Sequence, residues 1–134
     1  MLEELKKKKV NFYMDLELYP KNNAPYIEGY GKGYVIISGK TISNSIILLS
    51  DKYIDIGPVL DVNSKDIINS NLSQYKPDLI VYGSVKGLGY ETDMHKFLKE
   101  SNLPIEVMQI ASACRTWSVL IGDGRNICAV IEHK

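Results

Sequence analysis

The residues best suited to contact a ligand lie in two short segments, 83–89 (GSVKGLG) and 112–117 (SACRTW). Hydroxyl, ammonium and guanidinium groups are hydrogen-bond donors that suit an anion such as phosphate or carboxylate. The start of a helix adds backbone N–H groups and a partial positive charge. The candidate anion contacts are Gly83, Ser84, Lys86, Ser112, Arg115 and Thr116.

Arg115 carries the most weight among these candidates. The chain uses lysine fourteen times and arginine only twice, which favours a role for arginine that needs a planar, bidentate fork. That fork could clamp a ligand. It could equally form an internal ion pair with Glu106 or Asp123, or stack on Trp117, and the sequence leaves these alternatives open.

The sequence contains no evident catalytic constellation. Cys114 lies in the first turn of an expected helix, where a thiol can become acidic, but neither His95 in another helix nor His133 near the chain end is an obvious base. A packed core thiol is therefore the favoured interpretation. Cys114 and Cys128, fourteen residues apart, fit neither a disulfide framework nor a metal-ligand spacing. We expect no catalytic residue, metal or cofactor, and free thiols in a reducing cytoplasm.

Nucleotide-binding motifs are absent. The 83–89 segment lacks the GK[ST] ending of a P-loop, and the 87–92 segment (GLGYET) has Thr92 where the dinucleotide fingerprint needs glycine or alanine. Three glycines fall in the 29–33 segment (GYGKG), but no helix follows them. They predict a sharp bend or bulge between strands rather than a phosphate loop.

The elements that must position the candidate residues differ between the two halves of the chain. β-Branched and aromatic runs in the first half predict strands at 26–30, 34–38, 45–49 and 53–56. In the second half, Asn63 or Ser64 can cap a helix that ends at Lys76. Strands are then expected at 78–83, 105–109 and 126–132, and helices at 92–100 and 111–121, with Gly122 just past the last helix.

This order of elements predicts a layered α/β domain. Ligands of open α/β sheets collect beyond the carboxyl ends of parallel strands. If the strands at 78–83 and 105–109 are neighbours joined by a right-handed crossover, the 83–89 loop and the start of the 111–121 helix share one crevice.

Length and composition predict a single domain over residues 1–134. Apolar residues make up 45% of the chain, and sixteen basic side chains balance sixteen acidic ones. A neutral chain has no long-range attraction to nucleic acid or to an anionic membrane, so neither is an expected partner. No apolar run approaches the roughly 18 residues of a membrane helix. We interpret the charged 1–10 segment as a solvated helix end and not as a signal peptide.

Four ordered blocks of the sequence resemble a known family. The blocks YGKGYVIISGK, PDLIVYGS, LPIEVMQIASACRTW and LIGDGRNICAVI are similar to the Mth-type domain family of unknown function. That family is related in pattern to the mitochondrial respiratory complex I assembly factor and to the adipogenesis-associated Mth-domain protein. The resemblance is strongest over residues 30–131. Positions that match the family pattern are Gly83, Glu106, Met108, Ala113, Arg115, Thr116, Gly124 and Arg125.

The resemblance implies a three-layer β+α/β/α fold around a mixed central sheet, with the last strand antiparallel to its neighbours. It implies no established catalytic activity. This sequence departs from the family pattern at Val85, where a second glycine is common, at Ile110, where threonine is usual, and at Trp117-Ser118. The first two departures narrow the expected crevice and make it less polar.

Two functional hypotheses follow. The first is a small soluble, non-catalytic domain of the protein-interaction or assembly-factor type, which binds a protein partner or its own copy. The second is a small-anion-binding protein or enzyme that uses the crevice between the 83–89 loop and the start of the 111–121 helix.

Overall fold

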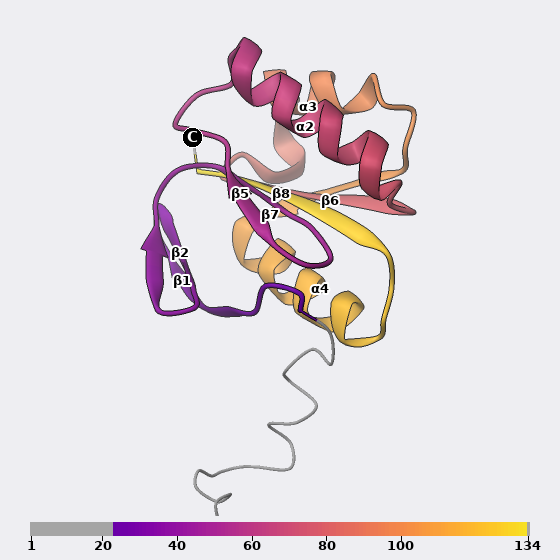
Figure 1. The fold of residues 1–134 in the computed structure, drawn as a ribbon. Helices are drawn as coiled ribbons and strands as arrows, with labels where there is room; N and C mark the ends of the chain where they lie inside the picture. Colours follow the sequence, from indigo (N-terminus) through magenta and orange to yellow (C-terminus); the bar gives the residue numbers. More distant parts are fainter. Residues whose placement is uncertain (1–22, 134) are drawn as a thin grey trace, which may run out of the picture.

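The computed structural model of the 134-residue chain describes residues 23–133. The charged 1–10 segment therefore lies outside the described residues. Within them the chain forms three layers, with a central sheet covered by α2 and α3 on one face and by α4 and a small sheet on the other (Figure 1). The expected α/β class and the β+α/β/α layering are both confirmed.

The central sheet has five strands in the order β5-β4-β8-β6-β7. β6 is parallel to both β7 and β8, whereas β4 is antiparallel to β8 and β5. The strands are β4 (Ile46–Leu48), β5 (Tyr53–Asp55), β6 (Leu79–Ser84), β7 (Ile105–Gln109) and β8 (Ile127–Glu132).

The last strand corrects one expectation from the family resemblance. β8 is antiparallel to β4 but parallel to β6. The reason is the crossover from β7 through α4 (Ile110–Gly122), which passes β6 and returns the chain in the same direction on its other side. A helix between two strands of one sheet favours parallel pairing in this way.

The small sheet contains β1 (Ile27–Gly31), β2 (Tyr34–Ile37) and β3 (Lys40–Ile42), all antiparallel. Gly33, with φ of 83°, lies in the turn between β1 and β2, and the register shifts between Ile27 and Gly29. The predicted sharp bend in the 29–33 segment is thus present, whereas the register shift lies within β1. β3 was not predicted, because three residues are too few for a periodic pattern to be recognised.

Two helices cover the other face of the sheet. α2 (Val62–Tyr75) begins after Asp61, not after Asn63 or Ser64 as expected. Asp61 accepts a hydrogen bond from the Ser64 backbone N–H, and the Ser64 hydroxyl in turn accepts from the Asp61 N–H, which together form a capping box. α3 (Asp93–Lys99) begins after Thr92 and buries Met94, Phe97 and Leu98, as predicted.

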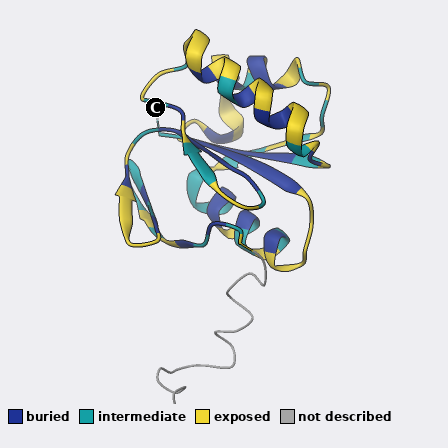
Figure 2. Cartoon of the chain, in the orientation of Figure 1, coloured by how far each residue is buried: buried dark blue, intermediate teal, exposed yellow. Residues whose placement is uncertain are grey.

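The core has two parts, one on each face of the central sheet. Trp117 and Ile121 of α4 pack with Val81 on one face, and Ile68 of α2 and Leu98 of α3 pack on the other. Figure 2 shows the inner strands of the central sheet as continuously buried, whereas the edge strands β5 and β7 are only partly buried. No helix within residues 23–133 is long and apolar enough to cross a bilayer.

Candidate functional site

The two segments singled out by the sequence lie side by side. β6 and β7 are adjacent and parallel, and Ser84 pairs with Gln109 at their carboxyl ends. The connection after β6 leads to α3 on one face, and the connection after β7 leads to α4 on the other. Such a divergence of neighbouring connections is the place where open α/β sheets bind ligands.

Gly83 serves close packing at this edge. A Cβ built on Gly83 would lie 2.6 Å from the Cβ of Ala113 and 3.4 Å from the Cα of Ile110. The absence of a side chain therefore lets the first turn of α4 rest directly on the sheet. Gly83 borders the candidate crevice through its backbone and leaves no open space above its Cα.

Ser84 and Lys86 differ in their exposure to solvent. Ser84 is fully buried, and its hydroxyl accepts a hydrogen bond of 3.0 Å from the Lys86 backbone N–H. Lys86 is exposed, and its Nζ lies 5.2 Å from the centre of the Tyr90 ring, a cation–π contact. After Lys86 the single turn η2 (Gly87–Gly89) packs on Gln109, whose Cγ would be 3.1 Å from a Cβ on Gly87. The Gln109 side chain thus fills part of the space between the two segments.

Ser112 and Arg115 come together on α4. The Arg115 guanidinium donates to the Tyr30 hydroxyl of β1 at 3.1 Å and to the Ser112 hydroxyl at 3.4 Å. Within residues 23–133 it pairs with no carboxylate, so neither Glu106 nor Asp123 supplies the expected ion pair. Arg115 is exposed, and no acidic side chain within the described residues pairs with its charge.

Thr116 turns away from this pair. Its hydroxyl contacts the sulfur of Met108 in β7 at 3.4 Å. The candidate contacts therefore separate into Ser112 and Arg115 beside β1, Thr116 beside β7, and Ser84 and Lys86 in the loop after β6.

The ends of α4 differ from the sequence expectation. Gln109 is the N-cap and makes no side-chain capping bond, while Ser112 is the third helical residue. At the other end Gly122 is still helical, and Gly124, with φ of 77°, adopts the left-handed conformation that ends the helix. Gly124, two residues after Gly122, thus takes the left-handed position that was expected of Gly122.

Both thiols are packed in the core, as expected. Cys114 and Cys128 are free and buried on opposite faces of the central sheet. Burial raises the pKa of Cys114 to about 11, although Arg115 acts in the lowering direction, and raises the pKa of Cys128 to about 12. Neither is a reactive thiolate at neutral pH. Among residues 23–133, no three histidine, cysteine or acidic side chains gather closely enough to hold a metal ion.

Three large apolar side chains in the segment after β6 are exposed to solvent. Val85, Leu88 and Tyr90 are 46%, 83% and 61% exposed, and we call them the apolar loop. Val59 and Val62, which follow β5, are also exposed. Asp55 at the end of β5 pairs with Ile46, Ile46 pairs with Ile131, and Ile131 pairs with Gly83, so β5 ends at the same edge of the sheet as β6. Large exposed apolar side chains that gather at one place commonly mark an interaction surface.

A series of hydrogen-bonded polar side chains begins at Thr92, just after the segment that carries the apolar loop. The Tyr82 hydroxyl lies 2.5 Å from the Thr92 hydroxyl and donates to the Glu132 carboxylate at the end of β8. Burial, followed by the hydrogen bond to Glu132, raises the pKa of Tyr82 well above its ordinary value. Burial is also the main reason that the pKa of Glu132 is raised; the hydrogen bond from Tyr82 acts in the lowering direction, and the charge of Asp93 acts in the raising direction. Tyr82 and Glu132 are 50 residues apart, so no local pattern could have revealed their contact.

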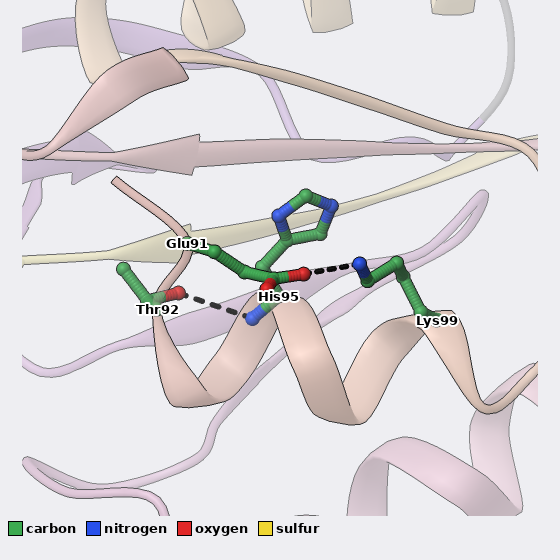
Figure 3. A network of polar contacts seen from close by, with 4 residues as sticks. All are labelled: Glu91, Thr92, His95 and Lys99. Carbon is green, nitrogen blue, oxygen red and sulfur yellow. Dashed lines mark hydrogen bonds and ion pairs between the residues drawn. The ribbon is translucent and has the colours of Figure 1, made fainter. Parts of the chain in front are cut away.

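The start of α3 completes this arrangement (Figure 3). Thr92 accepts a hydrogen bond of 3.0 Å from the His95 backbone N–H, and Glu91 forms an ion pair with Lys99 at the other end of the helix. The imidazole of His95 lies 6.0 Å from the Tyr82 ring, centre to centre, on the sheet side of α3. Thr92 therefore links the N-terminus of α3 to the buried hydroxyl of Tyr82.

These features define a class of protein: a small three-layer α/β domain with a mixed sheet and a divergent carboxyl edge. Residues 27–132 match the model of a protein family of unknown function, DUF498/DUF598, and the chain belongs to that family. This confirms the resemblance seen in the sequence. No curated protein matches the chain in sequence.

Solved structures of similar fold come from several bacteria. A Bordetella parapertussis protein is 17% identical with a TM-score of 0.63, over 84% of this chain and 98% of its own. A Bartonella henselae protein described as an outer membrane protein is 24% identical with a TM-score of 0.61, over 85% and 98%. A Mth938-like domain from Bordetella pertussis is 14% identical with a TM-score of 0.60, over 92% and 91%. At these identities the likeness shows the fold alone.

Proposed function

We propose that the chain is a non-catalytic protein-interaction domain that binds its partner at the carboxyl edge of the central sheet. The observation that carries this proposal is the apolar loop, in which three large side chains within six residues are between 46% and 83% exposed. Keeping such side chains in water costs free energy that docking against an apolar surface recovers. An assembly-type role, as the sequence resemblance implies, is one form of this function.

The charges around the apolar loop indicate the chemistry of the partner. Lys86 lies within the loop, its Nζ is 5.2 Å from the centre of the Tyr90 ring, and it forms no ion pair among residues 23–133. Opposite charges across an interface increase the association rate and the specificity of binding. We therefore expect a partner surface that combines apolar side chains with Asp or Glu.

A site-specific photo-crosslinking experiment tests this function. A photoreactive residue replaces Leu88 in the full chain, and in a matched control it replaces Val119 of α4, which is 62% exposed. Cells that naturally encode the protein are irradiated, and the products are identified by mass spectrometry. We expect position 88 to cross-link to another protein with an acidic surface, and position 119 not to do so.

A second variant connects the cross-link to affinity. Because Leu88 is 83% exposed, Leu88→Asp should leave the fold intact while weakening binding to the identified partner by tenfold or more, equivalent to about 1.4 kcal/mol or more. Cross-links from position 88 to a second copy of the chain would show that the partner is another copy of this protein. Equal cross-linking from positions 88 and 119 would contradict the proposal.

Binding of a small anion is the second candidate function. It is favoured by Arg115, which Tyr30 and Ser112 hold in place and which has no carboxylate partner within the described residues. Titration with inorganic phosphate, followed by amide NMR shifts, should then affect Ser112 and its neighbours in the native protein but not in Arg115→Ala. Shifts that persist in Arg115→Ala would refute the assignment.

A cytoplasmic location is part of the proposal. Its support is that Cys114 and Cys128 are both unpaired, as is usual for proteins in reducing compartments.

A further inference from the structure

The segment that carries the apolar loop is attached at both ends. At one end Ser84 is buried in β6 and accepts a hydrogen bond from the Lys86 N–H. At the other end Thr92, also buried, contacts Tyr82 and caps α3. The position of residues 85–91 therefore depends on how firmly Thr92 is held.

The hydrogen bonds of Thr92 and Tyr82 have a defined direction when Glu132 is ionised. A carboxylate can only accept, so the single Tyr82 proton goes to Glu132. The Thr92 oxygen accepts from the His95 N–H and is then free to donate its own proton to Tyr82. The hydroxyls of Thr92 and Tyr82 then both donate and the Thr92 oxygen also accepts. The series of hydrogen bonds that holds the 85–91 segment ends at the Glu132 carboxyl group.

That carboxyl group occupies an unfavourable place for a negative charge. Glu132 is half-buried, and Tyr82 is its one hydrogen-bond partner within residues 23–133. It forms no ion pair there. His133 directly follows Glu132 and is partly buried. Two further titratable groups near these hydrogen-bonded residues come from α3. They are Asp93, whose charge opposes ionisation of Glu132, and His95, whose ring lies near Tyr82.

Burial of a carboxylate that has one hydrogen bond and no ion pair favours either proton uptake or access of water. Glu132 is only partly exposed, and water gains fuller access to it if the start of α3, which carries Thr92 and Asp93, moves away. We propose that the Thr92–Tyr82–Glu132 chain is a proton-sensitive latch, which holds the 85–91 segment on the sheet when Glu132 carries a proton and loosens when Glu132 ionises. The proposal rests on the proposed function in one respect, because the segment it controls carries the apolar loop.

The opening equilibrium of the latch depends on pH because opening is coupled to proton binding by Glu132. The pKa of Glu132 is raised in the closed structure above its ordinary 4.5, and an opened, hydrated carboxyl group would return toward that value. The closed state therefore binds the proton more tightly and is favoured at low pH. Its advantage falls as pH rises from 4.5 through the raised pKa, and each pKa unit of difference changes the opening equilibrium tenfold.

Amide hydrogen exchange on the isolated full chain tests the latch. Protection factors of residues 85–95 are measured between pH 4 and 8 in the native protein and in Glu132→Gln, whose neutral amide oxygen still accepts from Tyr82. We expect native protection to fall severalfold across the raised pKa. In Glu132→Gln it should stay constant with pH and exceed the native value at pH 7.

Three further variants separate the latch from general effects. Tyr82→Phe should lower protection of residues 85–95 severalfold, whereas Tyr75→Phe, which removes the exposed bond from Tyr75 to Asp51, should not. Asp93→Asn should keep the pH-dependent step and move it to lower pH. Identical protection in the native protein and Glu132→Gln at every pH would overturn the proposal. No partner is present in this experiment, so its failure leaves the cross-linking result for Leu88 unaffected, and the reverse also holds.

Discussion

Gly83 is the position where a single added methyl group should have the clearest effect. Its Cβ would lie 2.6 Å from the Cβ of Ala113 in α4, well inside contact distance. We predict that Gly83→Ala lowers the free energy of unfolding by about 1–3 kcal/mol, the usual cost of overpacking. Urea denaturation measures this change.

Two variants test the cause. Gly89→Ala adds a methyl group where nothing lies within 4 Å and should change stability by less than about 0.5 kcal/mol. Ala113→Gly combined with Gly83→Ala removes the clashing carbon and should recover part of the loss, less the cost of glycine in a helix, about 1 kcal/mol. Additive losses in the double variant would show that the clash is not the cause.

The sequence located the candidate site only in part, for a reason that individual residues make clear. It identified the 83–89 and 112–117 segments and placed them correctly at one edge of the sheet. It could not assign Arg115 to Tyr30, because residues 85 positions apart in the sequence share no local signal. For the same reason it missed Glu132, which looks like an ordinary solvent-facing acid at the end of a strand.

The helices show what a periodic pattern can establish. Burial of Ile68 and Leu72 in α2, and of Met94 and Leu98 in α3, followed directly from apolar spacing. The helix ends were less certain, since Asp61, Asn63 and Ser64 are all good caps by residue type. Strand order depends on pairing between distant segments, which spacing within one segment does not encode.

The cap of α2 leads to a prediction on stability and pH. Backbone hydrogen bonding, first to Ser64, lowers the pKa of Asp61 below its ordinary 3.8. A lowered carboxyl pKa means that the stabilisation is present at neutral pH and is lost as pH falls through the lowered value. Asp61→Ala should therefore reduce the melting temperature by a few degrees at pH 7, with a smaller difference from the native protein near pH 2.

Asp66 supplies the control for the Asp61 variant. It is exposed on the same helix, and within residues 23–133 it makes no hydrogen bond or ion pair. Asp66→Ala should leave the melting temperature nearly unchanged at both pH values. Equal effects of the two variants would assign the change to helix propensity or net charge instead of the cap.

The three layers are joined unequally. The small sheet contacts the rest of the protein largely through α4, where Trp117 is fully buried and its indole N–H donates to the Pro25 carbonyl at 3.0 Å. We predict that Trp117→Phe loosens residues 27–42 more than the central sheet. Hydrogen exchange should show at least a tenfold loss of protection in β1 and β2, with a smaller change in β6 and β8.

Phe97→Leu provides the comparison, because Phe97 is buried on the opposite face of the central sheet. It should reduce protection in α2 and α3 without selectively affecting the small sheet. A uniform loss of protection in Trp117→Phe would mean that the three layers unfold as a single cooperative unit.

The central position of β8 has a consequence for biosynthesis. β8 lies between β4 and β6, so it alone joins the β4–β5 hairpin to the β6–β7 pair. A nascent chain whose residues 127–132 are still inside the ribosome holds two sheet fragments, and the backbone groups of β4 and β6 that pair with β8 are unpaired. Until those residues emerge, the fragments are open to chaperones and to aggregation, and the central sheet closes in one late step.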